Sequence, residues 1–167
     1  MDTVNTLATG GFADIIGFIG NFLALLVVAG VLFLFALKAG RAAFITLVMA
    51  LYAGFALFTV FPYKELLSGD SAIATFVANM LIFGALTFFP YVLLRRISTS
   101  GSMQINPILL FGLALLAGGF VLSLGYHILG LSAVLPLTPS LSALFGPDKY
   151  FFWWFIAPLV GIFLAAR

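Results

Sequence analysis

An uncharged, apolar segment lies near the start of the chain: residues 15–37 read IIGFIGNFLALLVVAGVLFLFAL. A helix needs about 20 consecutive apolar residues to cross a hydrocarbon core of about 30 Å. Residues 42–61, 71–94 and 107–130 meet the same requirement. A shorter segment, residues 150–166, begins with an aromatic cluster typical of a membrane interface and would cross with its flanking residues reaching toward the headgroups. The sequence therefore predicts an all-α, polytopic transmembrane helix bundle with five spans.

The composition of the 167-residue chain supports this prediction, because 64% of the residues are hydrophobic and only 7% are charged. Soluble domains are roughly 45–50% apolar and about 25% charged, and disordered chains combine low hydrophobicity with high charge. So few charges cannot cover a water-facing surface, which excludes both classes. No linker or charge block interrupts the pattern, so residues 1–167 are predicted to form a single transmembrane domain.

The placement of Lys and Arg sets the expected orientation, because cytoplasmic loops of membrane proteins are enriched in both. With the N-terminus outside, five basic residues fall on the cytoplasmic side: Lys38, Arg41, Arg95, Arg96 and Arg167. Only Lys64 and Lys149 fall on the outer side, each beside an acidic residue. The expected topology is N-out/C-in.

Residues 131–147, between the fourth and fifth spans, are apolar but are broken by Pro136 and Pro139, so they cannot form a spanning helix. Residues 138–145, TPSLSALF, predict a short helix lying at the membrane interface. A re-entrant turn buried between helices is the alternative, because irregular backbone is tolerated at depth only inside protein or a wet cavity.

Proline and asparagine give local signals within the predicted helices. Asn106 followed by Pro107 predicts a capped start for the fourth span, with proline at the first helical position. Pro90 and Pro158 lie inside the third and fifth spans, where proline predicts a kink about one turn earlier.

Small and polar residues recur at helical spacing along the fourth span: Gly112, Gly119, Ser123, Tyr126, His127 and Gly130. Small residues let helices approach closely, and hydroxyl and imidazole groups can bond across the contact. We favour a packing seam within the bundle or between subunits. The functional alternative is that His127 lines a polar cavity, because ionisable residues within membranes mark functional sites. Its place near the helix end would also let it meet water and need no partner.

The other spans carry isolated polar side chains: Asn21 in the first, Thr46 in the second, and Thr75 and Asn79 in the third. Bonds from Asn21 and Asn79 to neighbouring helices would contribute roughly 0.6 kcal/mol each. The structural role is again favoured. The alternative is a channel or transporter path along Ser123, His127, Asn79, Asn21 and Thr46, although no acidic residue lies within the spans to drive it.

Residues that carry cofactor or catalytic chemistry are scarce. The chain has no cysteine and one histidine, so thiolate sites are excluded and a zinc site could not be assembled easily. Ser123 and His127 lie one turn apart with no acid or oxyanion donor nearby in sequence, which makes no recognisable nucleophile arrangement. A net charge of +2 is no nucleic-acid signal in a membrane chain. We expect no enzymatic activity, no cofactor and no nucleic-acid partner.

The middle of the chain resembles the colicin V production protein (CvpA-like) family of small bacterial inner-membrane proteins. Residues LKAGR at 37–41, ITLV at 45–48 and Tyr52 are similar to that family's glycine–basic turn between its first two helices. The glycine-rich fourth span, at residues 112–119, is similar to the family's later glycine-bearing helix. The chain departs from the family at residues 101–106, GSMQIN, where a charged connector would precede the fourth helix. The resemblance implies a role in toxin export or envelope maintenance, and it carries over no catalytic residue.

The sequence therefore predicts a multi-pass protein of the bacterial cytoplasmic (inner) membrane. Its partners are expected to be the lipid bilayer and either further copies of this chain or other membrane subunits. The expected function is that of a non-enzymatic subunit or scaffold, acting through helix–helix contacts in an envelope- or secretion-related complex. A small channel or transporter subunit is the alternative.

Overall fold

Every element in the part of the chain that the structure describes is helical, which confirms the all-α fold class. The computed structural model describes residues 20, 22–63, 71–97, 106–134 and 138–165. Its elements are α2 (Leu23–Ala39), α3 (Arg41–Thr59), α4 (Ala72–Ile97), α5 (Pro107–Leu124), the π-helical turn η2 (Gly125–Leu129), the 3-10 turn η3 (Leu131–Ala133), α6 (Pro139–Phe145) and α7 (Asp148–Ala165).

Four helices are long and apolar enough to cross a membrane: α3, α4, α5 together with η2, and α7. Their length and composition are compatible with an integral membrane protein, and they correspond to four of the five predicted spans. The segment predicted to be short, residues 150–166, starts earlier, at Asp148, and reaches 18 residues. The first predicted span overlaps α2, whose 17 residues measure about 26 Å and which ends two residues later, at Ala39. Residues 15–19 and 21 of that span lie outside the described residues.

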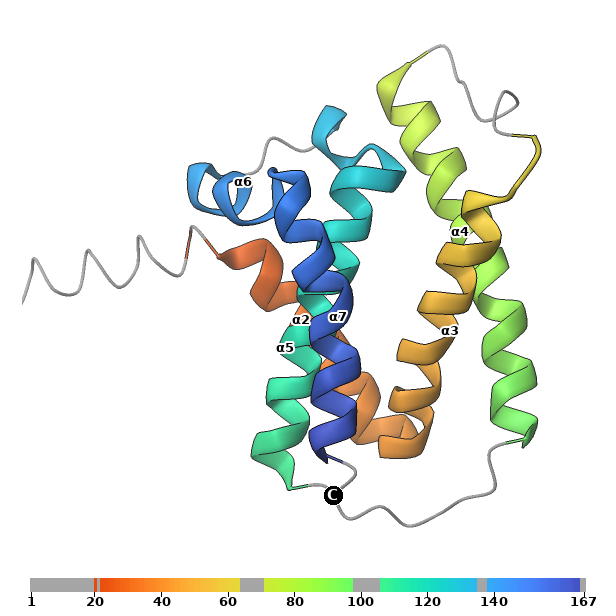
Figure 1. Ribbon diagram of the computed structural model, residues 1–167, viewed down its shortest axis with the longest axis vertical. Helices are drawn as coiled ribbons and strands as arrows, with labels where there is room; N and C mark the ends of the chain where they lie inside the picture. The colour runs from red at the N-terminus through yellow and green to blue at the C-terminus, as the bar shows by residue number, and fades with distance from the viewer. Residues whose placement is uncertain (1–19, 21, 64–70, 98–105, 135–137, 166–167) are drawn as a thin grey trace, which may run out of the picture.

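The helices form two groups (Figure 1). In one group α5 lies between α2 and α7 and packs against both, and in the other α3 and α4 form an antiparallel hairpin. Beyond α3, helix α4 makes smaller contacts with η2 and η3. The chain therefore places α4 at the edge of the bundle, with only Phe83, Thr87 and Pro90 buried.

Two clusters of buried apolar side chains join the groups. Phe44 and Val48 of α3 pack with Leu110 and Leu113 of α5 in the first cluster. The second cluster joins α3, α4 and α5 through aromatic rings: the Phe58 and Phe83 centroids lie 6.0 Å apart, and Tyr52 stacks on Phe120 at 4.5 Å. These rings contribute both buried area and defined edge or face contacts.

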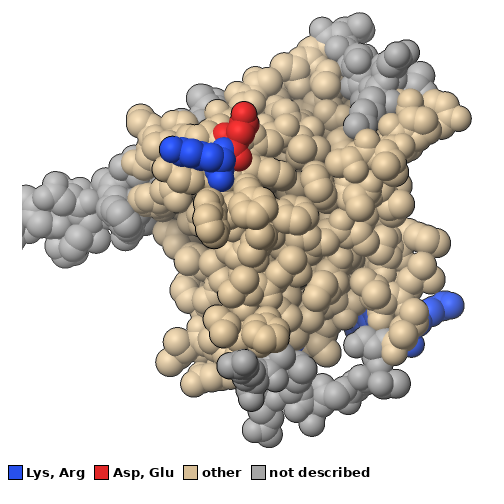
Figure 2. Space-filling model, viewed as in Figure 1, with Lys and Arg blue, Asp and Glu red and all other residues tan. Residues whose placement is uncertain are grey.

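Charged side chains of the described residues gather at two ends of the molecule, and a broad uncharged band lies between them (Figure 2). Asp148 and Lys149 begin α7 at one end. At the other end, Lys38 closes α2 while Arg95 and Arg96 lie in the last turn of α4. The uncharged band is the surface that lipid would contact.

The local signals at the helix ends operate as the sequence predicts. The Asn106 side chain accepts a hydrogen bond from the Ile108 amide at 3.2 Å, and Pro107 is the first helical residue. Gly40 joins α2 to α3 with a φ of 91°, a conformation that other residues rarely adopt. Both α4 and α7 continue as helices through Pro90 and Pro158.

The fourth span does not end as a regular α-helix. Residues Gly125–Leu129 form a π-helical turn, in which the Gly130 amide donates to the Gly125 carbonyl. Gly130 itself has a left-handed φ of 81° and begins the turn into η3. The extra residue that a π turn inserts redirects the side chains that follow it, and His127 lies within this turn.

The α3–α4 hairpin depends on a close approach at Gly54. A Cβ atom at Gly54 would overlap the Thr87 hydroxyl and lie 3.0 Å from the Thr87 Cα. We expect Gly54→Ala to lower the free energy of unfolding by about 1–3 kcal/mol, because the helices would have to separate. Unfolding in mixed detergent micelles measures it. Gly84→Ala on α4 is the matched control, since a Cβ there meets nothing within 4 Å; equal stability of the two variants would contradict the packing.

Candidate functional site

The structure brings four of the predicted site residues toward one end of the bundle, where α6 and the start of α7 lie. Gly119 and Ser123 are buried on α5, and Tyr126 and His127 follow in η2. A Cβ at Gly119 would overlap the Trp154 ring of α7, so glycine is required for this approach. The candidate site is thus a contact between α5, η2, α6 and α7 within one chain.

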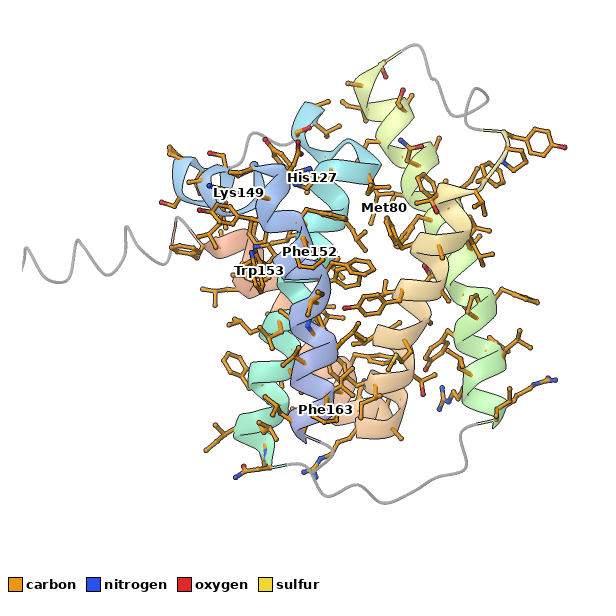
Figure 3. The ribbon with its side chains drawn as sticks, viewed as in Figure 1. Met80, His127, Lys149, Phe152, Trp153 and Phe163 are labelled. Atoms are coloured by element: carbon orange, nitrogen blue, oxygen red, sulfur yellow. The ribbon has the colours of Figure 1, made fainter. Side chains whose placement is uncertain are left out.

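His127 has one hydrogen-bond partner and one nearby carboxylate within the described chain, so it does not depend on water alone. Its Nε2 lies 2.7 Å from the Phe145 carbonyl oxygen, and because a carbonyl only accepts, Nε2 carries the proton. Its Nδ1 lies 3.5 Å from a carboxylate oxygen of Asp148, which is fully exposed. The ring also meets Phe151 edge-on, with centroids 5.1 Å apart. Figure 3 shows His127 at the same end as Lys149.

Trp154 holds the neighbouring carbonyl of α6. Its indole Nε1 donates to the Leu144 oxygen at 3.2 Å, and its ring lies over Phe145 with centroids 4.9 Å apart. The last carbonyls of any helix lack intrahelical donors. His127 and Trp154 together satisfy two such carbonyls at the end of α6, and this fixes the short helix against the bundle.

Ser123 takes no part in this hydrogen bonding. Its side chain is fully buried, and its Oγ has no hydrogen-bond partner among the described residues. His127 therefore does not act on the Ser123 hydroxyl in this arrangement. The described residues also contain no group of three His, Cys, Asp or Glu side chains that could hold a metal ion.

The remaining predicted residues lie apart from this cluster. The Asn79 amide on α4 donates to the Leu129 carbonyl at 3.3 Å, which ties α4 to the end of η2. Thr75 lies in the first turn of α4, where its backbone amide donates to the Ser71 carbonyl. Gly112 lies near the opposite end of α5, and a Cβ there meets nothing within 4 Å. Asn21 lies outside the described residues.

The structure gives a packing role to Tyr52, which the sequence marked only as part of the family resemblance. Its hydroxyl donates to the Phe155 carbonyl at 2.5 Å, and its ring meets the Phe155 ring edge-on at 4.9 Å. This bond joins α3 to α7 across 103 residues of sequence. The only sequence signal was the residue type, since a buried tyrosine usually finds a partner for its hydroxyl.

Two adjoining apolar grooves lie between α4 and the helices α2 and α5. The first, of about 400 Å³, lies among α3, α4 and α5 and extends to Phe35 and Tyr91. The second, of about 450 Å³, lies among α2, α4 and α5. Both are lined by Met80, which Figure 3 places between the two groups of helices. The path residues Thr46, Asn79, Ser123 and His127 line neither groove.

Comparison of the chain with protein-family models, with curated proteins and with solved structures finds no match. The resemblance to the colicin V production protein family therefore stays a prediction.

Trp154→Phe tests the attachment of α6. Phenylalanine keeps a ring near Gly119 but removes the donor to the Leu144 carbonyl, and the loss of one such bond is worth about 1 kcal/mol. We expect amide exchange of residues 139–146 to accelerate roughly five-fold, as measured by hydrogen–deuterium exchange in micelles. Trp153→Phe is the control, because Trp153 projects from the exposed face of α7 (Figure 3). Unchanged exchange in Trp154→Phe would show that the bond does not hold α6.

Proposed function

We propose that this chain is a non-enzymatic subunit or scaffold of a membrane complex, acting through contacts between its helices and those of a partner. The partner is a further copy of the chain or another membrane subunit. The proposed setting, an envelope- or secretion-related complex of the bacterial cytoplasmic membrane, rests on the resemblance of residues 37–52 and 112–119 to the CvpA-like family.

One observation carries the proposal: within the described spans, three polar side chains bond to main-chain carbonyls of the same bundle, although the buried Ser123 and Thr87 hydroxyls have no partner there. Thr46 donates to the Ala42 carbonyl of its own helix at 2.8 Å, while Tyr52 and Asn79 donate to carbonyls of neighbouring elements. A conducting path would instead turn such groups toward a water-filled cavity. The two grooves beside α4 are apolar, which supports a bundle that conducts nothing.

Glycines on the outer surface supply the contact positions. Gly30 on α2 and Gly112 on α5 lie in spans where a Cβ would meet nothing within 4 Å, so packing inside the chain does not explain them. Glycine at a helix surface allows another helix to approach closely in a membrane, where no hydrophobic force drives association. We therefore assign these two positions to the partner contact.

The charge distribution supports five spans with N-out/C-in orientation. Lys38, Arg41, Arg95 and Arg96 belong at the cytoplasmic side in this arrangement, and Figure 2 shows Lys and Arg at the end of the surface opposite Asp148. In the same arrangement α6 lies at the outer interface, beside the charged start of α7, with Leu141 and Phe145 turned into the protein. An interfacial segment is favoured over a re-entrant one.

The topology can be tested with single cysteines, since the chain has none of its own. We expect Ser71→Cys and Ser132→Cys to react with a membrane-impermeant maleimide in intact cells. Ile97→Cys should react only after the membrane is opened. All three positions are exposed, so burial does not limit the reaction. Labelling of Ile97→Cys from outside would reverse the orientation.

The partner contact can be tested by Gly30→Leu and Gly112→Leu, which fill the space a partner helix would use. We expect the wild type to form a higher-order complex in mild detergent, measured by light scattering and cross-linking, and we expect both variants to lose it. Val160→Leu, on the exposed face of α7, is the control and should keep it. A wild-type chain that is a lone monomer contradicts the scaffold role. Ion or solute flux through vesicles, abolished by His127→Ala, would favour the channel alternative.

A further inference from the structure

We propose that the first groove beside α4 is a binding site for one acyl chain of an anionic phospholipid, with the lipid phosphate held by Arg95 and Lys38 at the groove's basic end. This inference concerns a surface that the proposed partner contact does not use, so either proposal can fail without the other.

The length of the groove along α4 matches the thickness of the hydrocarbon layer of one lipid leaflet. Along α4 it extends from Met80 to Tyr91, which is about 16 Å of helix and about half of a hydrocarbon core of about 30 Å. Its volume of about 400 Å³ lies in the range of small-ligand sites. An acyl chain fits a groove of this shape because the wall is apolar: Phe35, Leu47 and Leu51 face Phe83 and Phe88.

Glycine opens this groove on the α4 side. A Cβ at Gly84, which lines the groove, would meet nothing within 4 Å. Neighbouring helices therefore do not require the missing side chain, unlike at Gly54 in the same hairpin, where Thr87 fills the space. The space beside Gly84 is therefore available to a molecule outside the described chain, such as a lipid acyl chain.

The basic end of the groove is built by two parallel helices. Phe35 of α2 and Tyr91 of α4 meet there, with ring centroids 6.5 Å apart. Lys38 follows Phe35 by one turn and Arg95 follows Tyr91 by one turn, and both helices run toward the same end (Figure 1). Lys38 and Arg95 therefore lie about one turn beyond the Phe35–Tyr91 contact, at the end of the groove.

Arg95 is positioned by the groove wall itself. Its Nη1 donates to the Tyr91 hydroxyl at 3.1 Å, and its guanidinium carbon lies 5.9 Å from the Tyr91 ring centroid. A guanidinium has five N–H donors, so most stay available for a phosphate, which it can bind with two parallel bonds. The only acidic residue among those described, Asp148, is at the opposite end (Figure 2). The charge at this end therefore favours an anionic ligand.

Native mass spectrometry of the full chain in mild detergent tests the site, with phosphatidylglycerol and phosphatidylcholine of identical acyl chains as probes. We expect wild type to retain phosphatidylglycerol in preference to phosphatidylcholine. Gly84→Leu should lose both lipids, because its side chain occupies the groove. Arg95→Gln should weaken phosphatidylglycerol roughly five-fold, since one basic residue near an anionic headgroup has an effect of that size. It should weaken phosphatidylcholine less, because the choline cation already offsets the charge of that lipid's phosphate.

Matched controls separate this site from general lipid contact and from the partner contact. Gly112→Leu adds the same side chain on α5 outside the groove, and Arg96→Gln removes the adjacent charge, which has no bond to Tyr91. Both should bind phosphatidylglycerol as wild type does, whether or not Gly112→Leu loses a protein partner. Unfolding curves confirm that each variant folds. Retention of phosphatidylglycerol by Gly84→Leu, equal binding of the two lipids, or displacement by glycerol phosphate alone would overturn the proposal.

Discussion

A membrane offers no water to backbone carbonyls, so each carbonyl that a helix leaves unpaired must find a donor inside the protein. Side chains meet this need at several points in the structure. His127 and Trp154 reach the last carbonyls of α6, and Asn79 reaches the carbonyl of Leu129 at the end of η2. Tyr52 adds a further bond between elements, to the Phe155 carbonyl of α7. Lipid is as apolar as the side chains, so apolar contact alone gives little preference for one relative position of the helices. These hydrogen bonds fix the relative positions of the elements that they join.

The sequence predicts the spans and the local helix cap, but it does not predict the long-range bonds between side chains and carbonyls. The spans follow from hydropathy alone, and four of them agree with the structure to within a few residues. The Asn106 cap is also predictable, because donor and acceptor lie two residues apart. The partners of His127 and Tyr52 are not, since a carbonyl acceptor 18 or 103 residues away has no side-chain signature. The π turn that carries His127 is not predictable either, because no residue type in Gly125–Leu129 distinguishes it from a regular helical turn.

The two kinds of glycine in the structure separate internal packing from outward surfaces. Gly54 and Gly119 admit a neighbouring side chain of the same bundle, and Thr87 and Trp154 fill the space. Gly30, Gly84 and Gly112 face open space at the bundle surface. The spacing of the α5 glycines in the sequence places them on one face of the helix. Spacing cannot show which of these glycines contacts a neighbouring helix and which faces open space. The surfaces beside the open glycines are where we propose that this chain meets a partner helix and a lipid.

The order of the helices has a consequence for biosynthesis. Helices α3 and α4 are consecutive, so their hairpin can form as soon as both have left the ribosome. The group formed by α2, α5 and α7 joins the first and last described helices of the chain, and such long-range contacts form slowly. In the proposed five-span arrangement, α2 therefore waits in the bilayer until α5 is synthesised, and α5 then waits for α7. The face of α5 that later receives Trp154 must meanwhile be covered by lipid or by an insertion factor.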